Sequence, residues 1–502
     1  MGTALIDTGD NDRPGPAAAE NAASVGTVLI DTGTTTTRPG SRRECRSPVV
    51  TEVISESRPG RRARHYHPVV TSGAVVRPEP GDEGLTGGPW IEPRGDSFGA
   101  VRSLLVGVAL VMSCNGLLRV ALGVRAELED FGLAVTGIVM AGYFLGFLFG
   151  TRAAEHFISS VGHIRVFAAL SSVGSTAAIL HVVWIHPVSW TLLRLAYGLC
   201  LAGILVTVES WLNDMATNAT RGRMLSRYMI VTMGGMGVGQ LLLNLADPGG
   251  FKLFVVSSAL ISFALVPVAL SASTAPPLVV PEPISLRELV KIVPLGLLTA
   301  FWVGVSQGCL MGLGAFYAAS EGLSNTRISL FVVSSMVGSV AFQWLVGSAS
   351  DRVPRRYVIL VVAAVAAGSA GLHLLVPVGS ALSLLLMLVH GGSTFPLYSL
   401  AVATTADSVS PAQLTGASAS LVRVSGVGAV IGPTLGGALM AVIAPWVFFG
   451  VLIVCHAVIA LYVVYRMFTR PALPVAEQGT FDPWPVRASA VAANLLRRPR
   501  RG

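Results

Sequence analysis

Twelve long apolar runs limit this chain to one class of fold. Each run is close to the roughly 20 residues that an α-helix needs to cross about 30 Å of hydrocarbon. The predicted spans are 101–123, 133–153, 165–185, 189–212, 224–246, 252–272, 292–317, 328–348, 357–377, 380–405, 414–442 and 444–467. Only 12% of the residues are charged, about half the share found in an ordinary soluble domain. We therefore predict an all-α membrane protein with about twelve transmembrane helices.

The apolar runs form two sets of six that repeat each other. The segment from Gly203 to Leu242, an apolar run, a polar loop and a glycine-rich run, recurs from Ser393 to Gly437. At one constant offset, the coinciding pairs are Asp214 with Asp407, Gly235 with Gly428, and Gly239 with Gly432. Such a duplication is typical of secondary transporters built from membrane repeats. The sequence predicts two six-helix bundles, 100–272 and 292–468.

Three polar stretches lie outside the bundles. Residues 1–99 are rich in Gly, Pro, Arg and Thr and lack periodicity, so we expect a disordered cytoplasmic tail. Residues 273–291 are proline-rich and then briefly amphipathic, which predicts a cytoplasmic linker. Residues 469–502 end in an arginine cluster and are expected to form a basic cytoplasmic tail.

The orientation of the helices is predicted from Lys and Arg in the loops, which favour the cytoplasmic side. The loops on the N-terminal side carry Arg152, Arg165, Arg221, Arg223, Arg227, Arg287, Lys291, Arg352, Arg355 and Arg356. The opposite loops carry Arg125, Lys252 and Arg327. We expect a multi-pass protein of the cytoplasmic membrane, embedded in the lipid bilayer, with both termini in the cytoplasm.

Several classes of function are disfavoured. The net charge of +8 comes from arginines in tails and loops, not from a basic face with interleaved aromatic residues, so no nucleic-acid partner is expected. The five cysteines are scattered, which supports neither a metal site nor a disulfide framework. The sequence has no P-loop and no nucleophile–base constellation. We therefore expect neither an enzyme nor a cofactor, and no ATP-driven pump.

A charged loop follows the eighth run. It reads Gly-Ser-Ala-Ser-Asp-Arg-Val-Pro-Arg-Arg from Gly347 to Arg356. This loop resembles the signature GxxxD[RK]xGRR of the major facilitator superfamily, with Pro354 in the usual glycine place. The resemblance implies a cytoplasmic gate that includes Asp351, Arg352, Arg355 and Arg356. The counterpart in the first half has Ser159 where the acid belongs, so we expect Asp214 and Asp407 to contribute to the gate.

Two further motifs support the resemblance. Arg194 and Gly198 match the superfamily's RxxxG pattern in the fourth helix. The eleventh run resembles its antiporter motif, which is normally in the fifth helix, where this chain has Gln240 in the proline position. Glycines at four-residue spacing also let helices pack closely without any antiport. The packing positions are Gly235, Gly239, Gly428, Gly432, Pro433 and Gly436.

The whole of 100–468 resembles the major facilitator superfamily, most nearly its YcaD-like branch. The resemblance implies two pseudo-symmetric bundles around a central cavity lined by spans one, four, seven and ten. Counting 1.5 Å per residue places Asn115, Gln307 and His390 near mid-membrane on such helices. These side chains either contact substrate or form hydrogen bonds between helices.

Charged residues inside the spans suggest the substrate and the coupling ion. Arg119, Arg194 and Arg423 favour an anionic or carboxylate-bearing substrate. Glu209 is the one carboxylate well inside a span and is a candidate for proton coupling, as is His390. Alternatively, Glu209 forms a structural pair with a nearby arginine such as Arg227.

We therefore predict a monomeric secondary transporter that moves a small molecule by alternating access, with proton coupling as a hypothesis. Two alternatives stay open. One is a multidrug/proton antiporter of the same fold, and the other is a transporter-like sensor that binds a ligand without moving it.

Overall fold

The computed structural model describes residues 97–215, 220–270, 285–410, 413–471, 473–479 and 481. Residues 1–96 of the predicted tail, most of the linker 273–291 and the end of the predicted basic tail lie outside the described residues. Residues 97–99, which were predicted to be disordered, are helical.

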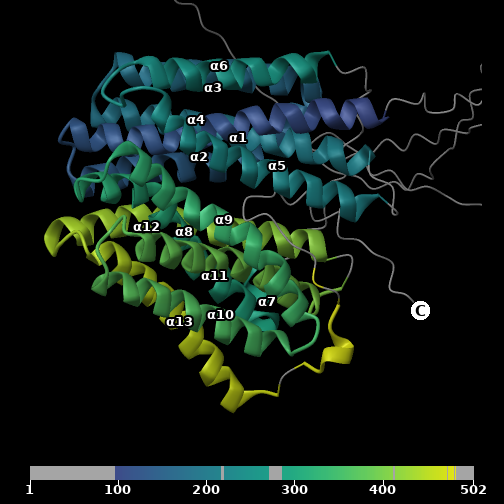
Figure 1. The fold of residues 1–502 in the computed structure, drawn as a ribbon. Helices are drawn as coiled ribbons and strands as arrows, with labels where there is room; N and C mark the ends of the chain where they lie inside the picture. The colour runs from purple at the N-terminus through teal and green to yellow at the C-terminus, as the bar shows by residue number, and fades with distance from the viewer. Residues whose placement is uncertain are drawn as a thin grey trace, which may run out of the picture. The chain divides into compact units, whose positions relative to one another are not determined.

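The described chain is helical throughout and contains no strand (Figure 1). The helices are α1 (Ser97–Leu128), α2 (Leu133–Val161), α3 (His163–Val183), α4 (Pro187–Met215), α5 (Arg221–Leu241), α6 (Lys252–Ala269), α7 (Leu286–Ile292), α8 (Pro294–Ser320), α9 (Asn325–Ser350), α10 (Arg355–Leu372), α11 (Ala381–Ala406), α12 (Leu414–Val442) and α13 (Val447–Thr469). Within the described ranges, 12 helices are long and apolar enough to cross a membrane. The prediction of an all-α membrane protein is confirmed, with most helix ends within a few residues of those expected.

Within each bundle the long helices alternate in direction, and short turns join many of them. Gly162 alone separates α2 from α3, and its φ of 86° is one that residues with a side chain rarely adopt. The Ser285 hydroxyl caps α7 by accepting a hydrogen bond from Glu288 N at 3.2 Å. We call the end where α1 begins and α9 finishes the motif end, and the opposite end, with Leu128, the far end.

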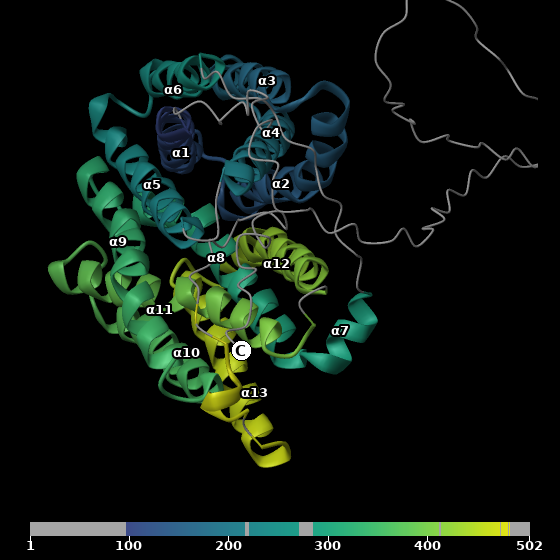
Figure 2. The same cartoon turned by 90° about the vertical axis from the view of Figure 1, so that its right-hand side faces the viewer.

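The helices form two bundles, α1–α6 and α8–α13 (Figure 2). In the first bundle α1 packs on α5 and α6, and α2 packs on α4. In the second bundle α8 packs on α12, and α9 packs on α11. The α1–α5 contact and the α8–α12 contact occupy corresponding places in the duplicated sequence. Across the bundles, α2 meets α12, α1 meets α8, and α5 meets α9.

Glycine backbones set these helix contacts. A Cβ on Gly239 would collide with the backbone of Ser113 on α1, and one on Gly432 would collide with the backbone of Val305 on α8. Gly235, Gly428 and Gly436 likewise lie against α1 or α8, and the carbonyl of Pro433 lies against Gly137 of α2. Gly237, also on α5, faces open space. Only some glycines of the repeat therefore serve close packing.

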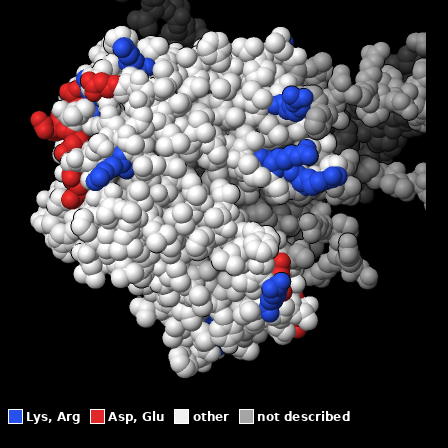
Figure 3. All heavy atoms as spheres, in the orientation of Figure 1, with Lys and Arg blue, Asp and Glu red and all other residues white. Residues whose placement is uncertain are grey.

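Charge is distributed unequally between the two ends (Figure 3). The far end carries the acidic residues Glu127, Glu129, Asp130, Asp247 and Glu321. The motif end of the first bundle exposes Arg152, Arg165, Arg223 and Arg227. Between the two ends the surface carries exposed apolar side chains such as Trp344, which is 79% exposed.

Candidate functional site

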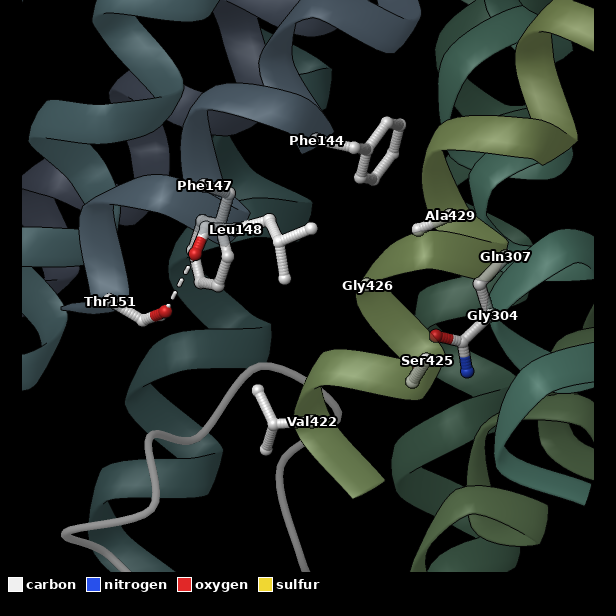
Figure 4. A pocket seen from close by; sticks show the side chains of 10 residues that line it. All are labelled: Phe144, Phe147, Leu148, Thr151, Gly304, Gln307, Val422, Ser425, Gly426 and Ala429. Atoms are coloured by element: carbon white, nitrogen blue, oxygen red, sulfur yellow. Dashed lines mark hydrogen bonds between the residues drawn. The ribbon is translucent and has the colours of Figure 1, made fainter. Parts of the chain in front are cut away.

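A pocket lies between the bundles, with walls from α2, α8 and α12 (Figure 4). Its lining is Phe144, Phe147, Leu148, Thr151, Gly304, Gln307, Val422, Ser425, Gly426 and Ala429. Most of these groups are apolar, and Gln307, Ser425 and Thr151 add polar atoms. Gln307 is the residue of the sequence-predicted cavity set that lines this pocket.

The bundles touch closely on the far side of this pocket. Gly137 of α2 lies against the Pro433 carbonyl, and Gly123 of α1 lies against Ala315 of α8. At the same end, the side chain of Asn244 receives a hydrogen bond from Thr326 Oγ1 at 2.9 Å. The pocket residues follow Gly137 along α2 toward the motif end. The far end is thus closed, and the pocket is on the motif-end side of the closure.

Two arginines flank one tyrosine ring beside the pocket. The Arg194 guanidinium lies 4.7 Å from the Tyr143 ring centroid, and the Arg119 guanidinium lies 5.5 Å from it. All three side chains are buried, with exposed fractions of at most 2%. The Tyr143 ring is 5.1 Å from Phe144 and 6.2 Å from Phe147, which line the pocket. Because the site is desolvated, cation–π contacts with the Tyr143 ring hold both guanidinium groups beside the pocket.

Arg119 also connects the two bundles. Its Nη1 lies 2.8 Å from the Met311 sulfur on α8 and 3.9 Å from the Met236 sulfur on α5. Sulfur is a weak acceptor, so these contacts position the guanidinium without neutralising its charge. We call Arg119, Tyr143 and Arg194 the arginine–tyrosine cluster.

Three buried carboxamides lie one helical turn along the chain from Arg119 or from one of the methionines that it contacts. Asn115 is one turn before Arg119, Gln307 is one turn before Met311, and Gln240 is one turn after Met236. Within the described residues, the amide nitrogens of all three and the carbonyl oxygens of Asn115 and Gln240 lack a hydrogen-bond partner. An unsatisfied buried polar group costs about 1–3 kcal/mol, so these atoms are suited to a polar ligand or ordered water. Gln240 was not among the site residues predicted from the sequence. It aligns with Pro433 of the second repeat, and this departure from the repeat was a signal.

Glu209 lies near the motif end of α4 and is 1% exposed. Tyr228 Oη on α5 donates a hydrogen bond to Glu209 Oε1 at 2.7 Å. Tyr228 follows Arg227, which the sequence suggested as a structural partner, but the Arg227 side chain is exposed. The α4–α5 interface therefore contains a buried carboxylate held by a phenol.

His390 faces the interior of the second bundle and does not line the pocket. Its Nδ1 lies 3.1 Å from the Ala366 carbonyl on α10. Thr394 Oγ1 lies 3.3 Å from His390 Nε2 and 3.1 Å from His456 Nε2 on α13. The depth predicted from the rise along the helix is compatible with this position, but the helix presents the imidazole to α10 and α13.

Arg423 is exposed, and it follows the pocket residue Val422 on α12. Its Nε donates to the Ala419 carbonyl at 3.2 Å, and its Nη2 donates to Ser420 Oγ at 3.1 Å. Its guanidinium is therefore bonded along its own helix, one residue from the pocket wall.

The predicted gate residues lie at the motif end. Arg355 forms a buried ion pair with Asp407, with side-chain exposures of 4% and 6%. Arg355 also donates to the Ala403 carbonyl at 3.1 Å and to Ser350 Oγ at 3.2 Å. Arg352 is exposed. The side chain of Asp214 lies outside the described residues.

The first bundle has a buried polar contact at the start of α3. His163 is the first residue of α3, as Arg355 is of α10. His163 Nε2 lies 3.0 Å from Ser210 Oγ on α4. This hydrogen bond joins the start of α3 to α4. In the part of the chain that the structure describes, no three His, Cys, Asp or Glu side chains are grouped to hold a metal ion.

Comparison with known proteins identifies similar chains. The family model of the Major Facilitator Superfamily matches residues 104–423 and 296–501. An uncharacterised MFS-type transporter YcaD from Escherichia fergusonii is 27% identical over 343 residues, covering 66% of this chain and 88% of the relative. An uncharacterised MFS-type transporter from Yersinia pseudotuberculosis is 29% identical over 315 residues, covering 61% of this chain and 79% of the relative.

Solved structures share the fold at low sequence identity. A nucleoside transporter NupG has a TM-score of 0.61 and 16% identity, covering 74% of this chain and 100% of that chain. A D-xylose-proton symporter has a TM-score of 0.57 and 13% identity, covering 73% of this chain and 97% of that chain. These two similarities describe the fold alone.

Proposed function

The chain belongs to the major facilitator superfamily, in its YcaD-like branch, and from this premise we propose that it moves a small anionic molecule across the membrane by alternating access. The proposal adds a substrate class and a mechanism to the family assignment. It rests on the arginine–tyrosine cluster beside the inter-bundle pocket.

The substrate class follows from the charges that surround the pocket. Arg119 and Arg194 place two guanidinium groups within 5.5 Å of the Tyr143 ring centroid in a buried environment. Electrostatic attraction is stronger there than in water, and guanidinium groups bind carboxylates and phosphates with good geometry. Asn115 and Gln307 add amide donors one turn away along α1 and α8. A small carboxylate with a hydrogen-bonding substituent fits this combination.

The proposed direction of access follows from the two ends of the molecule. We assign the motif end to the cytoplasm because its exposed loops carry the arginines. The far end is closed by the contacts of Gly137 and Gly123, so the structure corresponds to an inward-facing state under this assignment. Rocking of one bundle against the other would open the far end and expose the cluster to the other side.

Proton coupling is proposed at Glu209. This carboxylate is buried at the α4–α5 interface, and Tyr228 donates to it. Protonation would change the charge of one wall of the first bundle. One solved neighbour is a D-xylose-proton symporter, so coupling to protons occurs on this fold. His390 is the second candidate, but its hydrogen bonds lie inside the second bundle.

A thermal-unfolding screen tests the anion proposal. Purified wild type is mixed with anionic, neutral and cationic metabolites, beside Tyr143→Leu, which removes the ring that both arginines contact. Tyr143→Phe is the matched control because it keeps the ring. A ligand at 100 times its Kd adds about 2.7 kcal/mol of stability. We expect a small carboxylate to stabilise the wild type and Tyr143→Phe but not Tyr143→Leu. Stabilisation by cationic apolar compounds alone would reject the proposal.

Multidrug/proton antiport is the second candidate function. Phe144, Phe147, Leu148 and Val422 give the pocket an apolar wall that suits lipophilic cations. Growth protection against cationic dyes by the wild type, lost in Phe147→Ala, would support this function.

Deleting residues 1–95 distinguishes a transporter from a ligand sensor, because a transporter keeps its flux whereas a sensor loses its downstream response. We also propose a monomer in the cytoplasmic membrane with both termini inside.

A further inference from the structure

The chain that follows α13 lies on the charged loop that joins α9 to α10. We call residues 473–479 and 481 the tail segment and residues 347–356 the motif loop. Phe481 N donates a hydrogen bond to Asp351 Oδ1 at 2.7 Å, and Gly479 N donates to Asp407 Oδ1 at 2.9 Å. The Gly479 carbonyl accepts a hydrogen bond from Arg355 Nη2. Three charged side chains of the second bundle thus bind the backbone of one short segment.

One feature makes this contact selective for the tail segment. The Phe481 ring lies over Gly347, where an added Cβ would collide with the ring. A Cβ on Gly479 would come within van der Waals contact of the Asp407 carboxylate. Any extended peptide can offer backbone hydrogen bonds, whereas the aromatic ring over Gly347 distinguishes this one.

Arg356 directs the chain from α13 toward the motif loop. Its Nη1 donates to the Arg470 carbonyl at 2.6 Å, and its Nη2 donates to the Pro471 carbonyl at 2.8 Å. These bonds satisfy carbonyl groups left open at the end of a helix. The route of the chain is therefore fixed by the same loop that receives the tail segment.

We propose that the motif loop, together with Asp407, is a peptide-binding site for the tail segment, and that its occupation keeps the motif end open. Asp351 and Asp407 are acidic groups of the second bundle at the motif end. The first bundle exposes Arg152, Arg165, Arg223 and Arg227 at the same end. Closure brings these opposite charges together, and the tail segment competes for both carboxylates. This gating role rests on the proposed alternating access, whereas peptide binding does not.

Peptide binding is measured on the chain truncated after Arg470. A fluorescent peptide of residues 473–484 is titrated beside the same peptide carrying Phe481→Ala. We expect the unaltered peptide to bind and the altered one to bind about tenfold more weakly, as for loss of one well-packed ring. Gly347→Ala in the truncated chain weakens binding similarly, whereas Gly368→Ala, which faces open space, does not. Equal binding of the two peptides, or no binding, overturns the site.

Gating is measured by the reactivity of a cysteine in the pocket. Thr151→Cys, in a Cys45→Ser background, is labelled with a maleimide in the full chain and in the chain truncated after Arg470. We expect truncation to slow labelling about fivefold through a population shift, and the added peptide to restore the rate. Unchanged labelling of a truncated chain that binds the peptide overturns the gating role. Failure of every anion to bind would reject the proposed substrate but leave the peptide measurement valid.

Discussion

Replacing Asp407 by Asn breaks the buried ion pair with Arg355 while nearly keeping the shape of the side chain. Arg355 and Asp407 are 4% and 6% exposed, so little solvent screens the charge that remains. Removing one partner of such a pair typically costs about 3–5 kcal/mol. Arg355 keeps bonds to the Ala403 carbonyl and Ser350 Oγ, which places the expected loss near the lower end, at about 3 kcal/mol.

The matched control is the ion pair between Arg125 and Glu129. It joins residues one turn apart at the end of α1, with exposures of 11% and 29%. Pairs of this kind contribute about 0.3–0.5 kcal/mol, so Glu129→Gln changes stability little. Unfolding in mixed micelles with a rising fraction of denaturing detergent compares the two variants. The double variant Arg355→Met with Asp407→Leu leaves no buried charge and is expected to recover most of the loss.

Equal losses in Asp407→Asn and Glu129→Gln would refute the reasoning, as would a double variant no more stable than Asp407→Asn. Repeating the comparison in the chain truncated after Arg470 removes the hydrogen bond from Gly479 N to Asp407. The loss there reports the ion pair without the tail segment.

Three further predictions concern packing, gating and the buried carboxylate. Gly239→Ala is expected to destabilise the protein in thermal unfolding because the new methyl group collides with the α1 backbone. Gly237→Ala on the same helix faces open space and should have little effect. Equal effects of the two variants would contradict the role of Gly239 in close packing. Asn244→Ala loses the hydrogen bonds between Asn244 and Thr326 and Ser329 of α9, and we expect about fivefold faster labelling of a pocket cysteine from the far side. An unchanged rate would show that these hydrogen bonds do not keep the far end closed. Tyr228→Phe removes the hydrogen-bond donor to Glu209 and is expected to lower the free energy of unfolding by about 1–3 kcal/mol in the same assay. Glu209→Gln can still accept that hydrogen bond, and we expect it to abolish the pH dependence of ligand binding. A retained pH dependence would exclude Glu209 as the proton site.

The sequence predicted the helices well because membrane insertion requires length and low charge, and both can be counted. The predicted run 414–442 coincides with α12. The seven-residue helix α7 depends on a local cap, the Ser285 hydroxyl that accepts from Glu288 N, and α1 begins at Ser97, four residues before the predicted run. The length of an apolar run carries no information about such local features, so these helix boundaries could not be predicted from it.

The candidate site was predicted only in part because depth along a helix does not give its rotation. Gln307 lines the pocket, whereas His390 at similar predicted depth faces α10. Tyr143 was missed because a tyrosine in an apolar helix gives no sign of the face it occupies. The contact of Phe481 with Asp351 joins residues far apart in sequence through backbone atoms. No periodicity or residue type in the tail indicates such a contact.

The most direct test of the central claim is flux of the best-stabilising anion into vesicles that contain the purified protein. We expect saturable uptake by the wild type and by Arg352→Gln, whose arginine is exposed at the motif end. We expect loss of uptake in Arg194→Gln, which removes one guanidinium from the Tyr143 ring. Equal uptake by Arg194→Gln and Arg352→Gln would contradict the proposal that the arginine–tyrosine cluster binds the transported anion.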